Sequence, residues 1–184
     1  MKAVVFLADG FEECEGLIVV DILRRAGVDT VMASIMDSLQ IESTRLIKVT
    51  ADVMATDVDY DTVDLIVLPG GRLGTENLGA NDLVVEKCKE FAAYTSGKYL
   101  AAICAAPSLP ASLGLLEGKN ATCHPDFESH MAGAKLTYES VTTDGNIITG
   151  QGLGASFDFA FELVRKLVGE DMVDKIKKAI CYKH

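Results

Sequence analysis

The feature that most constrains this chain is an alternation of short, wholly apolar segments with longer segments of helical spacing. The apolar runs lack polar alternation, which is typical of parallel strands that are buried on both faces. They cover residues 2–8, 28–35, 64–68 and 99–103. Helical spacing is found over residues 15–26, 82–94, 155–168 and a last segment ending near 180, and a further helix opens around Pro107. This alternation predicts an α/β fold, with a mostly parallel sheet between helices.

Two shorter regions predict hairpins. Residues 44–49 are expected to form a strand, as half of a small hairpin at the sheet edge. The Asp144-Gly145 pair stands between two apolar runs, a pattern typical of a hairpin turn. The sequence contains no internal repeat, no low-complexity tract and no linker, so we predict that residues 1–184 form a single domain.

Charge and cysteine content exclude several classes of partner. The chain has 17 basic and 27 acidic residues, a formal net charge of −10, which is the wrong sign for a nucleic acid or an anionic membrane surface. No run reaches the roughly 20 apolar residues that a membrane span requires. The five cysteines are odd in number, widely spread and without a C-x-x-C pair. We therefore expect reduced thiols in a cytoplasmic protein that binds neither nucleic acid nor membrane.

Cys104 is the first candidate for chemistry, because ligands of open α/β sheets bind beyond the carboxyl ends of the strands. It follows the apolar run 99–103 and precedes Ala105, Ala106 and Pro107, where a helix is expected to begin. A thiol on such a turn faces the positive end of a helix, which favours the thiolate, and the arrangement is typical of a nucleophile elbow. A buried structural cysteine fits the same position equally well.

Acids, glycines and a histidine follow other strands. If the first strand lies beside the strand before Cys104, one of the acids in residues 12–15 can reach the sulfur, although the residues alone do not choose which. Acids at a helix N-terminus are also explained by the helix dipole. Gly70 and Gly71 fit either an oxyanion hole or a tight turn. His124 fits an acid–base role, although a lone loop histidine usually has none.

Metal and nucleotide sites are weaker alternatives. Ligand-type side chains occur within eight residues, at Cys123, His124, Asp126, Glu128 and His130, but their spacing matches no compact zinc pattern. The glycines of residues 150–154 suggest a nucleotide loop. A dinucleotide fingerprint belongs after the first strand, however, where the acids of this chain would repel phosphate. We therefore expect neither a metal nor a cofactor.

Five segments of the chain occur in a characteristic order. They are residues 7–15 (LADGFEECE), 21–27 (DILRRAG), 68–71 (LPGG), 102–107 (AICAAP) and 152–157 (GLGASF). Together they resemble the DJ-1/PfpI (ThiJ) family, close to its DJ-1 branch, along essentially the whole chain. The resemblance implies a flavodoxin-like three-layer sandwich that usually forms homodimers.

The resemblance also assigns residues. It implies that Cys104 is the nucleophile, that Glu15 is the glutamate hydrogen-bonded to it, and that His124 is the nearby histidine. The oxyanion amides fall on Gly71 and Ala105.

Other positions match the family less closely. Arg45 matches a pocket arginine, in a segment whose flanking residues differ. The chain departs from the family at Gln151, where an arginine is expected, at Leu153, where a proline is expected, and at Cys14, which replaces a methionine. Pro110 is expected to remove a donor from the helix after the elbow and to bend that helix.

These assignments imply a cofactor-independent glyoxalase or deglycase, which acts on a small aldehyde such as methylglyoxal or on a glycated protein. The thiolate of Cys104 would form a hemithioacetal, and Glu15 with His124 would move the proton. The alternative is a redox-responsive, chaperone-like protective protein that uses oxidation of the same cysteine. Cysteine peptidase activity is a third alternative, disfavoured because the sequence places no acid behind His124.

Overall fold

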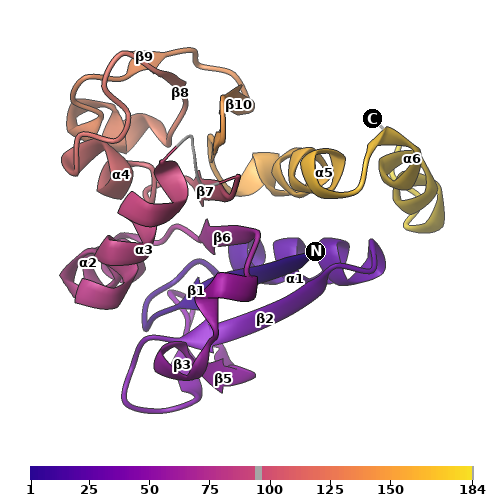
Figure 1. Cartoon of the computed structure of the whole chain (residues 1–184), viewed down its shortest axis with the longest axis horizontal. Coiled ribbons are helices and arrows are strands. Elements are labelled where there is room, and N and C mark those ends of the chain that lie inside the picture. Colours follow the sequence, from indigo (N-terminus) through magenta and orange to yellow (C-terminus); the bar gives the residue numbers. More distant parts are fainter. Residues whose placement is uncertain (94–96, 184) are drawn as a thin grey trace.

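The computed structural model describes residues 1–93 and 97–183, and its centre is a seven-stranded sheet (Figure 1). The strands stand in the order β10-β11-β7-β6-β1-β2-β5. Their bounds are β1 Lys2–Leu7, β2 Asp29–Ser34, β5 Val53–Met54, β6 Leu65–Leu68, β7 Tyr99–Ile103, β10 Val141–Asp144 and β11 Ile147–Gly150. Neighbouring strands pair in parallel except β10 and β11, which form an antiparallel hairpin at one edge.

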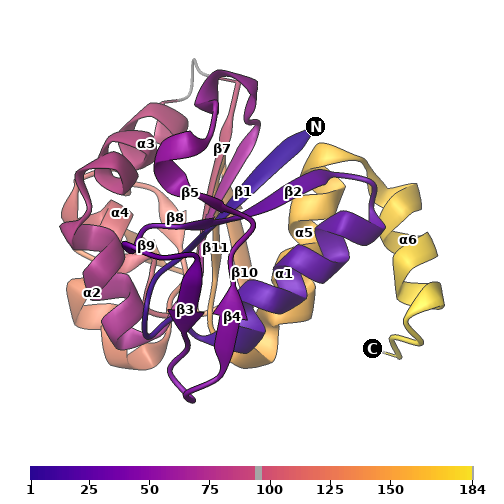
Figure 2. The same ribbon diagram turned by 90° about the horizontal axis from the view of Figure 1, so that it is seen from below.

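Helices cover both faces of this sheet. One face packs against α1, α5 and α6, and the other against α2, α3 and α4 (Figure 2). Their bounds are α1 Glu13–Arg25, α2 Arg72–Ala80, α3 Asp82–Ala92, α4 Ser108–Ser112, α5 Ser156–Leu167 and α6 Glu170–Ala179. Strand β1 shows why two layers are needed. Val5 and Leu7 face the first set of helices, Val4 and Phe6 face the second set, and all four are fully buried.

The predicted flavodoxin-like, three-layer α/β sandwich with a mostly parallel sheet is therefore confirmed. Most of the predicted elements are present with ends shifted by one or two residues. The turn at Asp144 and Gly145 joins β10 to β11 as expected. The predicted end of α3 at Tyr94, and Ser96 of the Ser96-Gly97 pair expected to close that helix, lie outside the described residues.

The small hairpin expected here is present, but the strand expected over residues 44–49 is wrong for residues 44–47. The hairpin consists of β3 (Gln40–Glu42) and β4 (Lys48–Thr50), residues 44–47 lie in its loop, and it forms a sheet of its own instead of an edge of the main sheet. The Ser43 hydroxyl accepts hydrogen bonds from the Arg45 amide at 3.4 Å and the Ile47 amide at 3.2 Å. A hydroxyl that accepts from the backbone just after it favours a turn over a strand.

Two features near the elbow also differ from expectation. Helix α2 was not predicted, because its sequence contains two glycines and begins directly after the Gly70-Gly71 pair. Pro110 does not bend a long helix, because α4 has only five residues and Pro110 is the third of them. In the first turn of a helix an N–H has no intrahelical partner, so its absence in proline removes no helical hydrogen bond. A second small sheet pairs β8 (Asn120–Ala121) with β9 (Lys135–Leu136).

Candidate active site

Cys104 occupies a strained turn directly after β7. Its φ of +64° lies in the left-handed region, which residues other than glycine seldom adopt and which costs roughly 1–3 kcal/mol. The turn is held from two sides. The Cys104 amide donates to the Gly150 carbonyl at 2.9 Å, and the Cys104 carbonyl accepts from the His124 amide at 2.9 Å. This is the backbone geometry of a nucleophile elbow.

Two backbone amides are directed at the Cys104 sulfur. The N–H groups of Gly71 and Ala105 hydrogen-bond to the thiol, and both act to lower its pKa. Gly71 precedes α2 with a φ of +90°, and a Cβ atom there would lie 2.8 Å from the Glu12 nitrogen. Only glycine fits at that position, so the first amide depends on the absence of a side chain.

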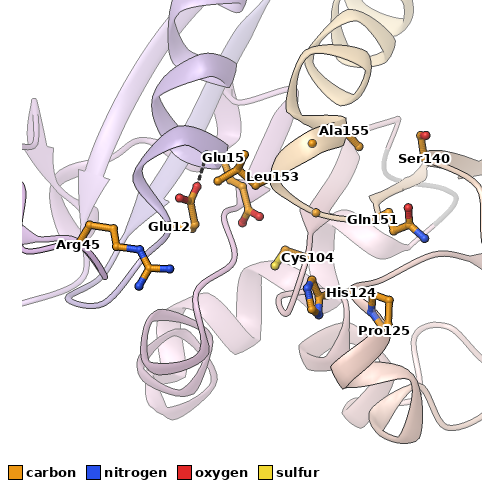
Figure 3. A pocket seen from close by; sticks show the side chains of 12 residues that line it. Glu12, Glu15, Arg45, Cys104, His124, Pro125, Ser140, Gln151, Leu153 and Ala155 are labelled. Carbon is orange, nitrogen blue, oxygen red and sulfur yellow. Dashed lines mark hydrogen bonds between the residues drawn. The ribbon is translucent and has the colours of Figure 1, made fainter.

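Glu15 lies in the first turn of α1 and is fully buried. Its Oε2 accepts a hydrogen bond from the Gly70 amide at 2.9 Å, and its carboxyl hydrogen-bonds to the Cys104 thiol. Figure 3 shows this carboxyl pointing toward Cys104. Burial raises the pKa of Glu15 to about 7, with a smaller contribution from the charge of Glu12.

The thiol and the carboxyl form a coupled pair. Burial raises the pKa of Cys104 to about 12, and the charge of ionised Glu15 adds to the increase. With one proton between them, the pair exists either as thiol and carboxylate or as thiolate and carboxylic acid. In the second form the two amides remain on the sulfur and the acid can donate to it. The second form supplies a thiolate at pH values between the pKa of Glu15 and the pKa of Cys104, although the two values make the first form the more populated one.

The groups that stabilise a thiolate at Cys104 differ from the ones expected from the sequence. We expected the positive end of a helix to favour the thiolate, but α4 is only five residues long and begins at Ser108. The groups that stabilise the thiolate are instead the individual amides of Gly71 and Ala105. Burial and the charge of Glu15 outweigh them, so the net effect is a raised thiol pKa. Cys104 is also only partly exposed, not an open surface cysteine.

Glu15 reaches Cys104 by a route that differs from the expected one. β1 does not lie beside β7, because β6 stands between them. The carboxyl crosses the end of β6 at Gly70, which has no side chain. A Cβ at Gly70 would lie 2.6 Å from the Cys104 Cβ and would also overlap Glu15 Oε2. The sequence showed paired glycines, but the role of Gly70 as the passage for Glu15 is visible only in the fold.

His124 also lies beside Cys104 in Figure 3, and the side chain is half-buried. Its Nδ1 accepts a hydrogen bond from the Asp126 amide at 3.2 Å, so Nε2 carries the proton in the neutral ring. One acid does lie near this histidine, because Asp126 Oδ2 is 3.8 Å from Nδ1. It does not orient the ring, since the carboxylate is mostly exposed and the accepting Nδ1 has no proton to donate to it.

Cys104 and Glu15 both line a pocket of about 560 Å³. Arg45 lies at its edge beyond Glu12, and the guanidinium acts to lower the pKa of that carboxyl, which burial raises. Glu12 also caps α1, because its Oε2 accepts from the Glu15 amide at 2.8 Å. Glu12 was one of three equivalent acids in the sequence, and no spacing distinguished its cap from the site carboxyl.

The opposite wall of the pocket carries the departures from the family pattern. Gln151, Leu153 and Ser140 line it, and the Gln151 amide donates to the Ser140 carbonyl at 2.9 Å. Nothing in the sequence marked Ser140, because it follows no predicted strand. Among the described lining residues Arg45 is the single arginine or lysine. Cys14 is exposed on α1 and does not line this pocket.

Within residues 1–93 and 97–183, no group of three histidine, cysteine or acidic side chains lies close enough together to hold a metal ion. The ligand-type residues near His124 are thus dispersed around the turn Pro125–His130. In the same ranges, no helix has the length and apolar character needed to cross a membrane.

Comparison with known proteins identifies the family. The sequence profile of the DJ-1/PfpI family matches residues 1–166. The chain belongs to the DJ-1/PfpI family.

Individual relatives agree with this assignment. The chain is 32% identical over 181 residues to "Protein dj-1beta" of Drosophila melanogaster, covering 97% of this chain and 96% of the relative. The crystal structure of Drosophila DJ-1beta superposes with a TM-score of 0.93 at 31% identity, over 100% of this chain and 98% of that chain.

Two further relatives show the range of the family. "Protein DJ-1 homolog B" of Arabidopsis thaliana is 37% identical over 179 residues, and the match covers 97% of this chain but only 40% of that longer protein. "Glutathione-independent glyoxalase DJR-1.2" of Caenorhabditis elegans is 28% identical over 172 residues, covering 92% of this chain and 90% of the relative.

Proposed function

We propose that the protein is a cofactor-independent glyoxalase or deglycase that uses Cys104 as its nucleophile. One observation carries the proposal. A thiol, a carboxyl with a pKa raised to about 7 and two backbone amides converge at the base of one pocket. The name of the Caenorhabditis elegans relative, a glutathione-independent glyoxalase, supports the same activity.

The first step is addition to an aldehyde. Glu15 takes the thiol proton, and the Cys104 sulfur forms a bond to the aldehyde carbon of methylglyoxal. The carbonyl π electrons move to the oxygen, which is then protonated to complete a hemithioacetal. The amides of Gly71 and Ala105 stabilise the developing oxyanion, because preorganised donors in a half-buried site need no reorganisation.

The second step moves a proton between the two carbons. Glu15 as carboxylate removes the proton from the former aldehyde carbon and returns it to the neighbouring carbon, while the hydroxyl proton passes from the oxygen of the first carbon to the oxygen of the second. The product is a lactoyl thioester. Water then cleaves the thioester to lactate and regenerates the thiol, so methylglyoxal plus water gives lactate. A pKa near 7 suits Glu15 to both halves of this transfer. His124, beside Cys104, assists by orienting the substrate carbonyl through Nε2–H.

The test is lactate formation from methylglyoxal without glutathione. The wild-type protein should form lactate, Cys104→Ala should not, and Cys88→Ala, which changes a cysteine in the core, should retain the activity. Release of amines from early glycation adducts is measured with the same three proteins. Lactate formation by Cys104→Ala at the wild-type rate would contradict the proposal.

A second function has its own supporting observation. The donors that would hold an oxyanion, Gly71 and Ala105, would also hold the oxygens of a Cys104 sulfinate, and the neighbouring Glu15 could donate as an acid. A redox-responsive protective role predicts selective gain of two oxygens at Cys104 after mild peroxide treatment, detected by mass spectrometry. Equal oxidation of all five cysteines would contradict it.

We also propose a homodimer. Leu17, Ile18 and Phe157 line an open apolar groove along α1 that a second copy could cover. Phe157 is 38% exposed, so a second copy seated on this groove would remove apolar surface from water. Light scattering should give twice the 19.7 kDa chain mass, and Phe157→Glu should give the single-chain mass.

A further inference from the structure

A second pocket lies on the other side of the elbow from the candidate active site. It has a volume of about 440 Å³, within the range of small-molecule sites, roughly 300–1,000 Å³. Its walls come from α2, from α4 and from the turn Pro125–His130, which lie together on one face of the sheet (Figure 2). None of its lining residues lines the active-site pocket. The two cavities are therefore separate sites.

The chemistry of this pocket combines an apolar wall with two opposite charges. Leu109 and Phe127 provide apolar surface, and Gly79 leaves space in front of Leu109. Arg72 and Glu76 both line the pocket, four residues apart on α2, so they lie on the same face of that helix. His130 also lines it, on the exposed side.

The two charged side chains have no ion-pair partner in the described part of the chain. Arg24, Arg25 and Arg165 each pair with an acid, whereas Arg72 stacks its guanidinium over the Phe127 ring at 4.8 Å. A stacked guanidinium keeps its N–H edge free for a carboxylate. Glu76 forms no ion pair with Arg72, although i,i+4 pairs commonly do so.

A hydroxyl in the same wall also has no partner. Thr75 lines the pocket and is 7% exposed, and its Oγ1 is buried without a hydrogen-bond partner among residues 1–93 and 97–183. A buried hydroxyl left without a partner is costly, but this oxygen has almost no exposed surface and is not itself a contact for a ligand.

We propose that this pocket binds a free α-amino acid with an aromatic or large apolar side chain. The carboxylate binds the Arg72 guanidinium, the ammonium group faces the Glu76 carboxylate, and the side chain packs on Leu109 and Phe127. A zwitterion matches the opposite charges of Arg72 and Glu76. An anion alone would lie near the like charge of Glu76, and a cation alone would lie near the like charge of Arg72. This pocket shares no group with the proposed catalytic machinery.

The test is binding of L-phenylalanine to the full chain, measured by ligand-observed NMR. Saturable binding is expected. 3-Phenylpropionate, which lacks the ammonium group, phenethylamine, which lacks the carboxylate, and glycine, which lacks the side chain, should each bind at least about tenfold more weakly.

Variants locate the binding. Arg72→Gln and Glu76→Gln should each weaken L-phenylalanine binding about tenfold, and Gly79→Leu should abolish it by filling the space. Gly79→Ala is the matched control, because a Cβ there lies 3.5 Å from Leu109 Cδ1, an ordinary contact. Cys104→Ala should bind as the wild type does. The proposal would be overturned by absence of saturable binding, by binding of the analogues as tight as that of L-phenylalanine, or by unchanged binding in Gly79→Leu.

Discussion

Two cysteines in this protein have pKa values raised to about 12, for different physical reasons. Cys88 lies fully buried in the middle of α3, and burial alone raises its pKa. Cys104 lies on the strained turn after β7, where burial and the charge of Glu15 raise the pKa and two amides oppose them. Protonation of Glu15 removes the charge that contributes to the raised pKa of Cys104, whereas it leaves the pKa of Cys88 unchanged. A thiol pKa alone therefore does not distinguish a structural cysteine from a reactive one.

The largest expected difference between the two regions is in activity. Cys104→Ala should lower kcat/KM for methylglyoxal at least about a thousandfold, because the nucleophile is lost. Cys88→Ala should keep kcat/KM and instead lower the free energy of unfolding by about 1–2 kcal/mol, because it leaves a small cavity. Lactate assays and denaturant unfolding measure the two effects. Equal losses of kcat/KM in Cys104→Ala and Cys88→Ala would contradict the assignment of Cys104 as the nucleophile and Cys88 as a structural cysteine.

The passage for Glu15 is the next test. Gly70→Ala should reduce kcat/KM at least about a hundredfold, because the added Cβ displaces both reacting groups. It should also lower the free energy of unfolding by about 1–3 kcal/mol through overpacking. Gly79→Ala, with only an ordinary contact at 3.5 Å, is the matched control and should keep kcat/KM. Its free energy of unfolding should not fall and should rise by up to about 1 kcal/mol, because alanine favours a helix more than glycine does. Full activity in Gly70→Ala would show that Glu15 does not need this route.

The raised pKa of Glu15 predicts how stability depends on pH. Between pH 4.5 and about 7 the folded protein holds a proton that the unfolded chain releases, so the free energy of unfolding falls as pH rises through this window. The total fall is up to about 3 kcal/mol. Glu15→Gln should remove it, so the variant should be more stable than the wild type at pH 8 while losing activity.

Thermal unfolding at pH 4 and pH 8 measures this effect. Glu117→Gln, at an exposed position, is the control and should follow the wild type at both pH values. A Glu15→Gln protein whose stability falls with pH as steeply as that of the wild type would assign the dependence to another group.

Glu12 should show the smallest effect. Glu12→Gln keeps an acceptor for the Glu15 amide but removes a charge that raises the pKa of Glu15, so the Glu15 titration should move to lower pH. The value of kcat/KM at pH 8 should stay within about threefold of the wild type. Glu12→Ala also loses the helix cap and should cost about 1 kcal/mol of stability. A Glu15 titration unmoved in Glu12→Gln would exclude this coupling.

The fold could be predicted largely from the sequence, because buried parallel strands are continuous apolar runs and their helices have regular spacing. The same reasoning failed for residues 44–47 and for α2, where side-chain hydrogen bonds to the backbone and glycine content outweigh periodicity. These local interactions leave no repeating pattern in the sequence.

The candidate site could be predicted only in part. Cys104 follows a strand, so its place on a strand-to-helix turn could be predicted from the sequence, although that position fitted a buried structural cysteine equally well. The choice of Glu15 over its neighbours came from family resemblance, because it depends on which carboxyl passes over Gly70 in three dimensions. The balance of burial, charge and amides that sets the thiol pKa is a property of the assembled site.

The most direct test of the shared proton is the pH dependence of Cys104 alkylation by iodoacetamide, followed by mass spectrometry of the Cys104 peptide. In the wild-type protein the rate should rise with pH through about 7, as the pair loses its first proton, and then reach a plateau. In Glu15→Gln the rise near pH 7 should disappear. A wild-type rate that shows no step near pH 7 and increases only toward strongly alkaline pH, as expected for an ordinary buried thiol such as Cys88, would contradict the account.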